Sequence, residues 1–187
     1  MNIILLGPPG SGKGTQGELL SQRAGLLRVA TGDVLRAAVE RQTPLGLEAQ
    51  RYMDQGLLVP DQVMLGLLEE ILSSPEAARG VIMDGFPRTI PQAEAVDRLL
   101  EARGHQVDRV LFFDVPDSEL SRRIVGRQSQ QGRSDDRREA FAKRLAVYRE
   151  QTAPLVEYFR RRGILQTIDA VGPIEAIAER VRAEVGV

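Results

Sequence analysis

The stretch NIILLGPPGSGKGTQ, residues 2–16, joins an apolar run to a loop that contains four glycines and one of the two lysines of the chain. Residues 2–7 have the length of a buried strand, and from Thr15 onward the apolar spacing is that of a helix. Between them, Gly7 is followed by four residues and then by Gly12 and Lys13, which is the spacing of a phosphate-binding loop. The stretch therefore predicts a strand, a phosphate-binding loop and a helix in succession.

The glycines of this loop suit the binding of an anion. Successive backbone N–H groups can curve around a phosphate only where no side chain intrudes, which Gly7, Gly10 and Gly12 allow. The N-terminus of the following helix adds free N–H groups and the positive end of its dipole, and Lys13 adds a full charge. The residues predicted to bind a nucleoside triphosphate are Gly10, Ser11, Gly12, Lys13, Gly14 and Thr15.

The residue after the lysine departs from the general motif. Gly14 stands where GTPases and motor proteins have a hydroxyl that binds Mg²⁺, so the sequence argues against those classes. We expect Mg²⁺ to be held by the phosphates and by water, with no direct protein ligand. Asp84, in the apolar run 80–85, is the carboxylate expected behind that water, and Asp33 and Asp135 are further candidates. A helix cap before Glu139 is an equally good account of Asp135.

Composition narrows the classes of function further. The 187 residues include 25 basic and 26 acidic side chains, and the net charge of −1 points to neither nucleic acid nor an anionic membrane. The chain has no cysteine and a single histidine, His105, which excludes disulfides, thiolate zinc sites and a histidine-based triad. No segment approaches the roughly 20 apolar residues of a membrane span, or the pattern of a signal peptide. We therefore expect a cytoplasmic protein.

Apolar runs alternate with amphipathic stretches along the chain. Helix-like spacing occupies the segments between the runs. Alternation of this kind predicts an α/β protein, a three-layer fold with a five-stranded parallel sheet flanked by helices. The expected strands, of which the last is the weakest, are residues 2–7, 80–85, 109–115, 164–169 and 26–30.

Two segments depart from this alternation. Residues 31–59 contain short helical patterns broken near Pro44 and Gly56, with no strand, and predict a helical insertion. Residues 127–136 are polar and predict a loop between two helices. We expect one domain, 1–187, with its core at 1–29, 60–126 and 137–187, the insertion at 30–59 and the polar loop at 127–136.

Six motifs occur in one order along nearly the whole chain: GPPGSGKGTQ, TGDVLR, GLLVPD, DGFPRTIPQA, RIVGR, and RSDD followed by KRL. In order and spacing they resemble the adenylate kinases. The resemblance implies reversible phosphoryl transfer between Mg²⁺·ATP and AMP to give two ADP, by a monomer whose lid, 127–136, is short and free of zinc. A UMP/CMP kinase is the close alternative, and a nucleotide-binding switch without turnover is a more distant one.

The resemblance places AMP in the helical insertion. Thr31 and Arg36 would contact the base and the phosphate, and Arg88 would hold the phosphate. Gln92 would read the adenine edge, since an amide both donates and accepts hydrogen bonds. UMP/CMP kinases look to have Ala and Asn in place of Thr31 and Gln92, so both residues favour AMP. The implied AMP-binding residues are Thr31, Arg36, Leu57, Leu58, Val59, Gly85, Arg88, Gln92, Arg133 and Arg144.

Transfer between two nucleotides requires several cations to converge on the moving phosphoryl group. The resemblance assigns ATP contacts to Arg123 and Arg127, and bridging contacts between donor and acceptor to Arg133 and Arg144. Gly172 would meet the ATP base. No general base is needed, because the attacking phosphate oxygen is already anionic. The expected catalytic residues are Lys13, Arg88, Arg123, Arg127, Arg133 and Arg144.

Overall fold

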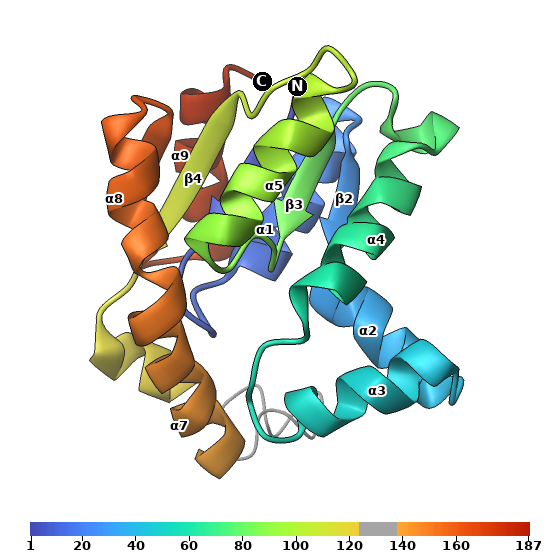
Figure 1. Ribbon diagram of the computed structural model, residues 1–187. Helices are drawn as coiled ribbons and strands as arrows, with labels where there is room; N and C mark the ends of the chain where they lie inside the picture. The colour runs from blue at the N-terminus through green and yellow to red at the C-terminus, as the bar shows by residue number, and fades with distance from the viewer. Residues whose placement is uncertain (124–137) are drawn as a thin grey trace.

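The apolar runs form a single parallel sheet, which lies at the centre of Figure 1. The structure is a computed structural model that describes residues 1–123 and 138–187. The strand order is β2-β3-β1-β4-β5, and every neighbouring pair is parallel. The predicted fold class is confirmed, the weak fifth strand included. The strands are β1 (Ile3–Leu6), β2 (Leu27–Ala30), β3 (Val81–Asp84), β4 (Arg109–Asp114) and β5 (Leu165–Asp169).

Helices connect the strands and cover both faces of the sheet. Residues 117–123 are also helical. Within residues 1–123 and 138–187, no helix is long and apolar enough to cross a membrane. The helices are α1 (Lys13–Ala24), α2 (Thr31–Glu40), α3 (Pro44–Met53), α4 (Asp61–Leu72), α5 (Ile90–Glu101), α7 (Arg138–Val147), α8 (Pro154–Arg161) and α9 (Ile174–Val185), with a 3₁₀ turn at Pro75–Ala77 and a π-helical turn at Tyr148–Thr152.

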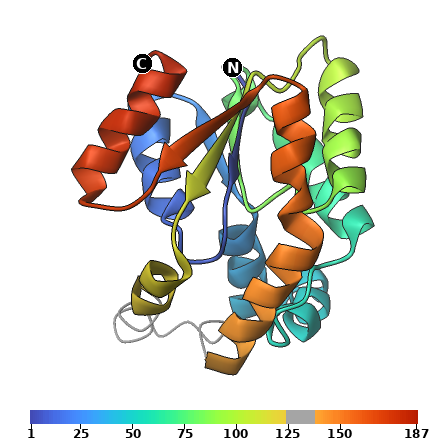
Figure 2. The same cartoon turned by 90° about the vertical axis from the view of Figure 1, so that its left-hand side faces the viewer.

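The unbroken apolar strands arise because both faces of the sheet are buried. Successive side chains of a strand point to opposite faces, and on β1 Ile4 and Leu6 join one buried cluster while Ile3 and Leu5 join the other. The first cluster takes its helical partners from α2, α3, α4, α5 and α8, and the second from α1, α9 and the helical segment 117–123. Figure 2, which looks along the layers, shows α8 and α9 on opposite sides of the sheet.

The strand order places a crevice at one edge of the sheet. The chain leaves β1 toward β2 and β3 on one side and returns to β4 and β5 on the other, so the order reverses at β1. In open parallel sheets, ligands bind at the carboxyl ends of the strands beside such a reversal. The loop after β1 and Asp84 at the end of β3 both lie at this edge.

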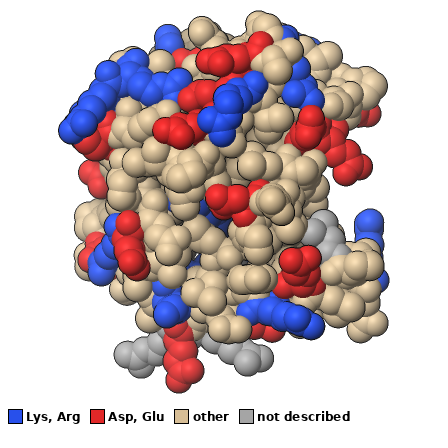
Figure 3. All heavy atoms as spheres, in the orientation of Figure 1, with Lys and Arg blue, Asp and Glu red and all other residues tan. Residues whose placement is uncertain are grey.

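The helical insertion faces this edge from outside the sheet. Figure 1 shows α2 and α3 below the strands, with α7 across from them. Helices α2 and α3 pack closely at Gly46. A Cβ on this residue would lie only 2.1 Å from the carbonyl oxygen of Ala38 on α2. The insertion also reaches α7: Gly56 has φ +68°, and a Cβ there would lie 2.8 Å from the carbonyl oxygen of Ala140. Basic and acidic side chains are interspersed over the face in Figure 3.

Candidate active site

The loop between β1 and α1 depends on glycine for its backbone path. Gly7, Gly10 and Gly12 have φ of 150°, 87° and 96°, values that other residues rarely adopt. A Cβ on Gly7 would also lie only 2.9 Å from the carbonyl oxygen of Phe113 on β4. Helix α1 begins at Lys13, immediately after Gly12, so the free N–H groups of its first turn lie at the loop.

The side chain of Lys13 folds back over this loop. Its Nζ donates to the carbonyl oxygens of Gly7 (2.6 Å) and Pro8 (2.9 Å) and to Oγ of Ser11 (3.2 Å). Ser11 is buried, with 1% of its surface exposed, and it contributes to the site by holding the lysine. These bonds keep the ammonium group where the backbone N–H groups of the loop converge.

A cavity of about 770 Å³ opens beside the loop. Most of the residues predicted to lie on the side of the phosphate donor line this cavity. A cavity of this size is typical of small-molecule sites. Gly172 lies on its rim in the loop after β5, with φ +121°. The predicted residues that line the cavity and belong to the donor side are Gly10, Gly12, Lys13, Gly14, Thr15, Asp33, Asp84, Arg123 and Gly172.

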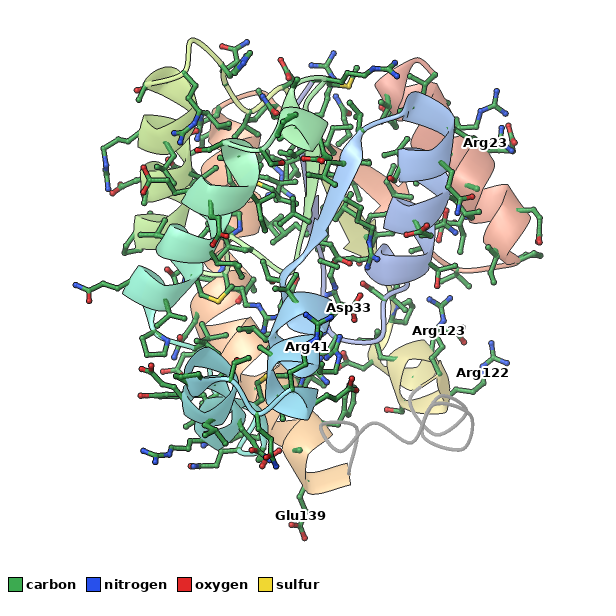
Figure 4. The ribbon with its side chains drawn as sticks, turned by 90° about the vertical axis from the view of Figure 1, so that its right-hand side faces the viewer. Arg23, Asp33, Arg41, Arg122, Arg123 and Glu139 are labelled. Atoms are coloured by element: carbon green, nitrogen blue, oxygen red, sulfur yellow. The ribbon has the colours of Figure 1, made fainter. Side chains whose placement is uncertain are left out.

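Arg123 is held in the wall of this cavity by three separate contacts. Its guanidinium donates to Glu119 Oε1 (2.7 Å), to the Ser11 carbonyl (3.2 Å) and to the Ala170 carbonyl (2.7 Å). Figure 4 shows Arg122 and Arg123 side by side on the helical segment 117–123, and both residues line the cavity. Hydrogen bonds from Arg122 and then Arg123 lower the pKa of Glu119 to about 2. The carboxylate therefore stays charged and fixes the arginine.

A second ion pair lies at the floor of the cavity, between β2 and β3. Arg28 Nη2 donates to Asp84 Oδ2 at 2.6 Å and lies 3.6 Å from Asp33 Oδ2. The side chains of Arg28 and Asp84 are only 17% and 13% exposed. Arg28 donates a hydrogen bond to one carboxylate oxygen of Asp84 and also lies near Asp33. The two predicted acidic residues are therefore close to the same guanidinium group.

The arrangement fits a Mg²⁺ ion that is held through water. Asp84 and Asp33 supply carboxylate oxygens, the donor type that Mg²⁺ prefers, and Mg²⁺ keeps several of its waters. Within residues 1–123 and 138–187, no group of three His, Cys, Asp or Glu side chains could ligate a metal directly. Asp84 and Asp33 are therefore the described residues that could lie behind the water shell of such an ion.

A smaller cavity of about 60 Å³ lies between the insertion and α5. Thr31 donates from Oγ1 to the Asp84 carbonyl (3.3 Å), and Arg88 donates from Nε to the Gly85 carbonyl (2.6 Å). Arg36 pairs with Asp33 at 2.5 Å. The predicted acceptor residues that line this cavity are Thr31, Arg36, Leu57, Leu58, Val59, Gly85, Arg88, Gln92 and Arg144.

Three arginines lie where the two cavities meet. Arg36, Arg88 and Arg144 each line both cavities. They come from α2, from the loop after β3 and from α7, which are far apart in the sequence. The other predicted arginines, Arg127 and Arg133, lie outside the described residues, as do Asp135 and the segment 127–136.

Sequence reasoning missed three charged residues at the site. Arg28 interrupts an apolar strand, and a charged residue at a buried strand position was the available signal. Glu119 precedes Arg122 and Arg123 by three and four residues, the spacing of helical ion pairs. Asp61 opens α4 and binds Gln92, but no local pattern distinguishes it from an ordinary acidic residue in the first turn of a helix.

A glycine loop after the first strand of a 2-3-1-4-5 parallel sheet, facing a helical insertion across a cavity, defines a phosphate-loop nucleotide kinase. Comparison with known proteins identifies the family. The adenylate kinase family model matches residues 5–164. The chain belongs to the adenylate kinase family, which makes it a nucleoside monophosphate kinase, and a UMP/CMP kinase is not favoured.

Similar proteins match over the whole chain. It is 47% identical to an adenylate kinase of Mycobacteroides abscessus over 186 residues, which cover 100% of this chain and 99% of the relative. It is 46% identical to one of Thermobifida fusca over 180 residues, 96% and 95% of the two chains. It is 41% identical to one of Citrifermentans bemidjiense over 212 positions, 99% of each chain, so that relative has residues without a counterpart among the 187 here.

Proposed function

We propose that the two cavities are the ATP and AMP sites of one phosphotransferase and that their junction is where the phosphoryl group moves. Family membership establishes the reaction, reversible transfer between ATP and AMP. The observation that carries the residue assignment is the set of three arginines, Arg36, Arg88 and Arg144, that line both cavities. Two polyphosphates that face each other need positive charge at that place.

On the donor side, the loop and Lys13 would hold the β and γ phosphates of ATP. The N–H groups of Gly10 to Thr15 would surround the anion, and Lys13 would exchange its carbonyl partners for phosphate oxygens. Arg123, already fixed by Glu119, would contact ATP beside Gly172 and the adenine. Arg127 would add a second guanidinium on the donor side.

On the acceptor side, Arg36 and Arg88 would hold the AMP phosphate, and Thr31, Gln92 and residues 57–59 would surround the base. The acceptor oxygen is anionic, so the residues need only orient it in line with the γ phosphate and shield the repulsion. Arg133 and Arg144 would bridge the two nucleotides during transfer. Exclusion of water by closure of the lid, 127–136, would prevent hydrolysis of ATP.

We also propose Mg²⁺ as the cofactor, with Asp84 and Asp33 behind its water shell, and no zinc. When bound, the ion would neutralise charge on the donor phosphates. The proposed division of the chain is a core of 1–29, 60–126 and 137–187, an insertion at 30–59 and a lid at 127–136. The family resemblance supports a cytoplasmic monomer.

A coupled assay with Mg²⁺·ATP and AMP, UMP, CMP or GMP as the acceptor tests this assignment. We expect AMP to be used far better than the other three. A preference for UMP or CMP would contradict the assignment of Thr31 and Gln92 to a purine site. Binding of nucleotides without turnover would contradict the catalytic role of the arginines.

A further inference from the structure

The side-chain amide of Gln92 is bound at both ends by other groups of the protein. Gln92 lies in the first turn of α5 and is 2% exposed. Its Oε1 accepts a hydrogen bond from the backbone N–H of Arg88 at 2.7 Å. Its Nε2 donates to Oδ1 of Asp61 at 2.5 Å, across 31 positions of sequence. Asp61 is the first residue of α4 and follows Pro60, the residue after the insertion.

These two partners determine which way the amide faces. A carboxylate only accepts hydrogen bonds, and a backbone N–H only donates them. Rotation of the amide by half a turn would set Oε1 against the Asp61 carboxylate and Nε2 against the Arg88 N–H, and both contacts would become repulsive. The orientation therefore follows from the chemistry of the partners, independently of how the oxygen and nitrogen are distinguished.

A fixed amide presents a fixed pattern to the small cavity that it lines. One hydrogen on Nε2 and one lone pair on Oε1 remain for a ligand. A 6-aminopurine offers a donor at N6 beside an acceptor at N1, which complements this pattern. A 6-oxopurine offers an acceptor at O6 beside a donor at N1, which the amide could match only after rotation.

We infer that Asp61 is a specificity-determining residue that positions Gln92 and so makes the acceptor site select a 6-amino over a 6-oxopurine monophosphate. The inference rests on the proposed role of Gln92 in the acceptor site. Asp61 itself does not belong to the lining of the small cavity, so it acts through Gln92. Selection arises because the wrong purine leaves buried polar groups unpaired.

The test compares kcat/KM for AMP and for inosine monophosphate, a 6-oxopurine nucleotide, in the wild type and in Asp61→Ala. We expect the preference for AMP to fall about tenfold, the usual size of one hydrogen bond to a charged group, through KM for AMP and with KM for ATP unchanged. Asp61→Asn, whose carbonyl can still accept from Gln92, should restore most of the preference. Gln62→Ala, the next exposed residue of α4, is the matched control and should change neither ratio.

A double-mutant cycle with Gln92→Ala separates this inference from the proposed site. In the Gln92→Ala background, Asp61→Ala should alter the preference by less than about twofold. Additive effects, or an unchanged preference in Asp61→Ala, would overturn the positioning role of Asp61. An unchanged preference in Gln92→Ala alone would instead overturn the assignment of Gln92 to the acceptor base. Asp61→Ser gives the same readout if Asp61→Ala folds poorly in a thermal unfolding measurement.

Discussion

The loop after β1 and the insertion after β2 build their halves of the site by different means. The loop is shaped by its backbone: Gly7 packs against Phe113, and Lys13 is bound by main-chain carbonyls within six residues of itself. The acceptor side relies on side chains, such as Arg36 with Asp33 and Gln92 with Asp61. Changes in the loop should therefore abolish chemistry, and changes on the acceptor side should alter only the use of AMP.

Lys13→Ala should have the largest effect. Removal of the charge from the phosphate loop should lower kcat about 100-fold or more, the scale of one transition-state electrostatic contact. Steady-state rates with AMP and ATP measure this. Lys143→Ala removes the only other lysine, which is exposed on α7, and should leave kcat close to the wild-type value. Near-normal turnover in Lys13→Ala would refute the phosphate-loop assignment.

Gly46→Ala should damage the insertion and spare the loop. The added methyl group would lie 2.1 Å from the Ala38 carbonyl, so α2 and α3 must separate. We expect the free energy of unfolding to fall by about 1–3 kcal/mol and KM for AMP to rise, with KM for ATP unchanged. Equal losses for AMP and ATP would show that the two sides do not behave separately.

Gly66→Ala is the matched control for that substitution. Gly66 lies within α4, and nothing lies within 4 Å of the position that its Cβ would take. Alanine is favoured over glycine in a helix, so the free energy of unfolding should rise by about 0.5–1 kcal/mol. Chemical denaturation measures both glycine variants, and KM for either nucleotide should stay unchanged in Gly66→Ala.

Glu119→Gln should loosen Arg123 and raise KM for ATP modestly, without affecting KM for AMP. Because Arg122 and Arg123 lower the pKa of Glu119 from 4.5 to about 2, the ion pair stabilises the fold fully above pH 4.5. That stabilisation is lost as the pH falls toward about 2. The difference in Tm between wild type and variant should therefore be constant at neutral pH and shrink in acid.

A second acidic residue provides a control for this prediction. Glu157 on α8 has the same spacing to two arginines, Arg160 and Arg161, at 2.8 and 2.9 Å. These bonds also lower the pKa of Glu157, but the residue lies away from the cavities. Glu157→Gln should change the acid dependence of Tm in the same direction and leave KM for ATP unaltered. A rise in KM for ATP in this variant too would show that Glu119 acts through stability alone.

Removal of zinc should have the smallest effect. A zinc-selective chelator should leave turnover unchanged while Mg²⁺ is present, because neither the ATP side nor the AMP side of the proposed site uses a structural zinc ion. Withdrawal of Mg²⁺ should abolish turnover. Inhibition by the zinc chelator, measured with excess Mg²⁺, would contradict the absence of zinc from the lid.

Most of the fold could be predicted from the sequence because strands and helices leave local periodic patterns. All five apolar runs became strands, and the glycine spacing located the loop. Pro60 and Asp61 mark the start of α4 in the sequence, between the insertion and the strand β3. The ion pair of Arg28 with Asp84 and the hydrogen bond of Gln92 with Asp61 join residues 56 and 31 positions apart, and no local pattern marks such pairs.

The sequence by itself determined the phosphate loop, the parallel α/β architecture and the family, because each depends on residues that are close together in the chain or on motifs in a fixed order. Only the tertiary structure decided which side chains meet. Arg36, Arg88 and Arg144 converge because the strand order and the return of α7 bring three distant segments to one edge of the sheet. The orientation of Gln92 was decided in the same way, because α4 and α5 set its amide between Asp61 and the Arg88 backbone.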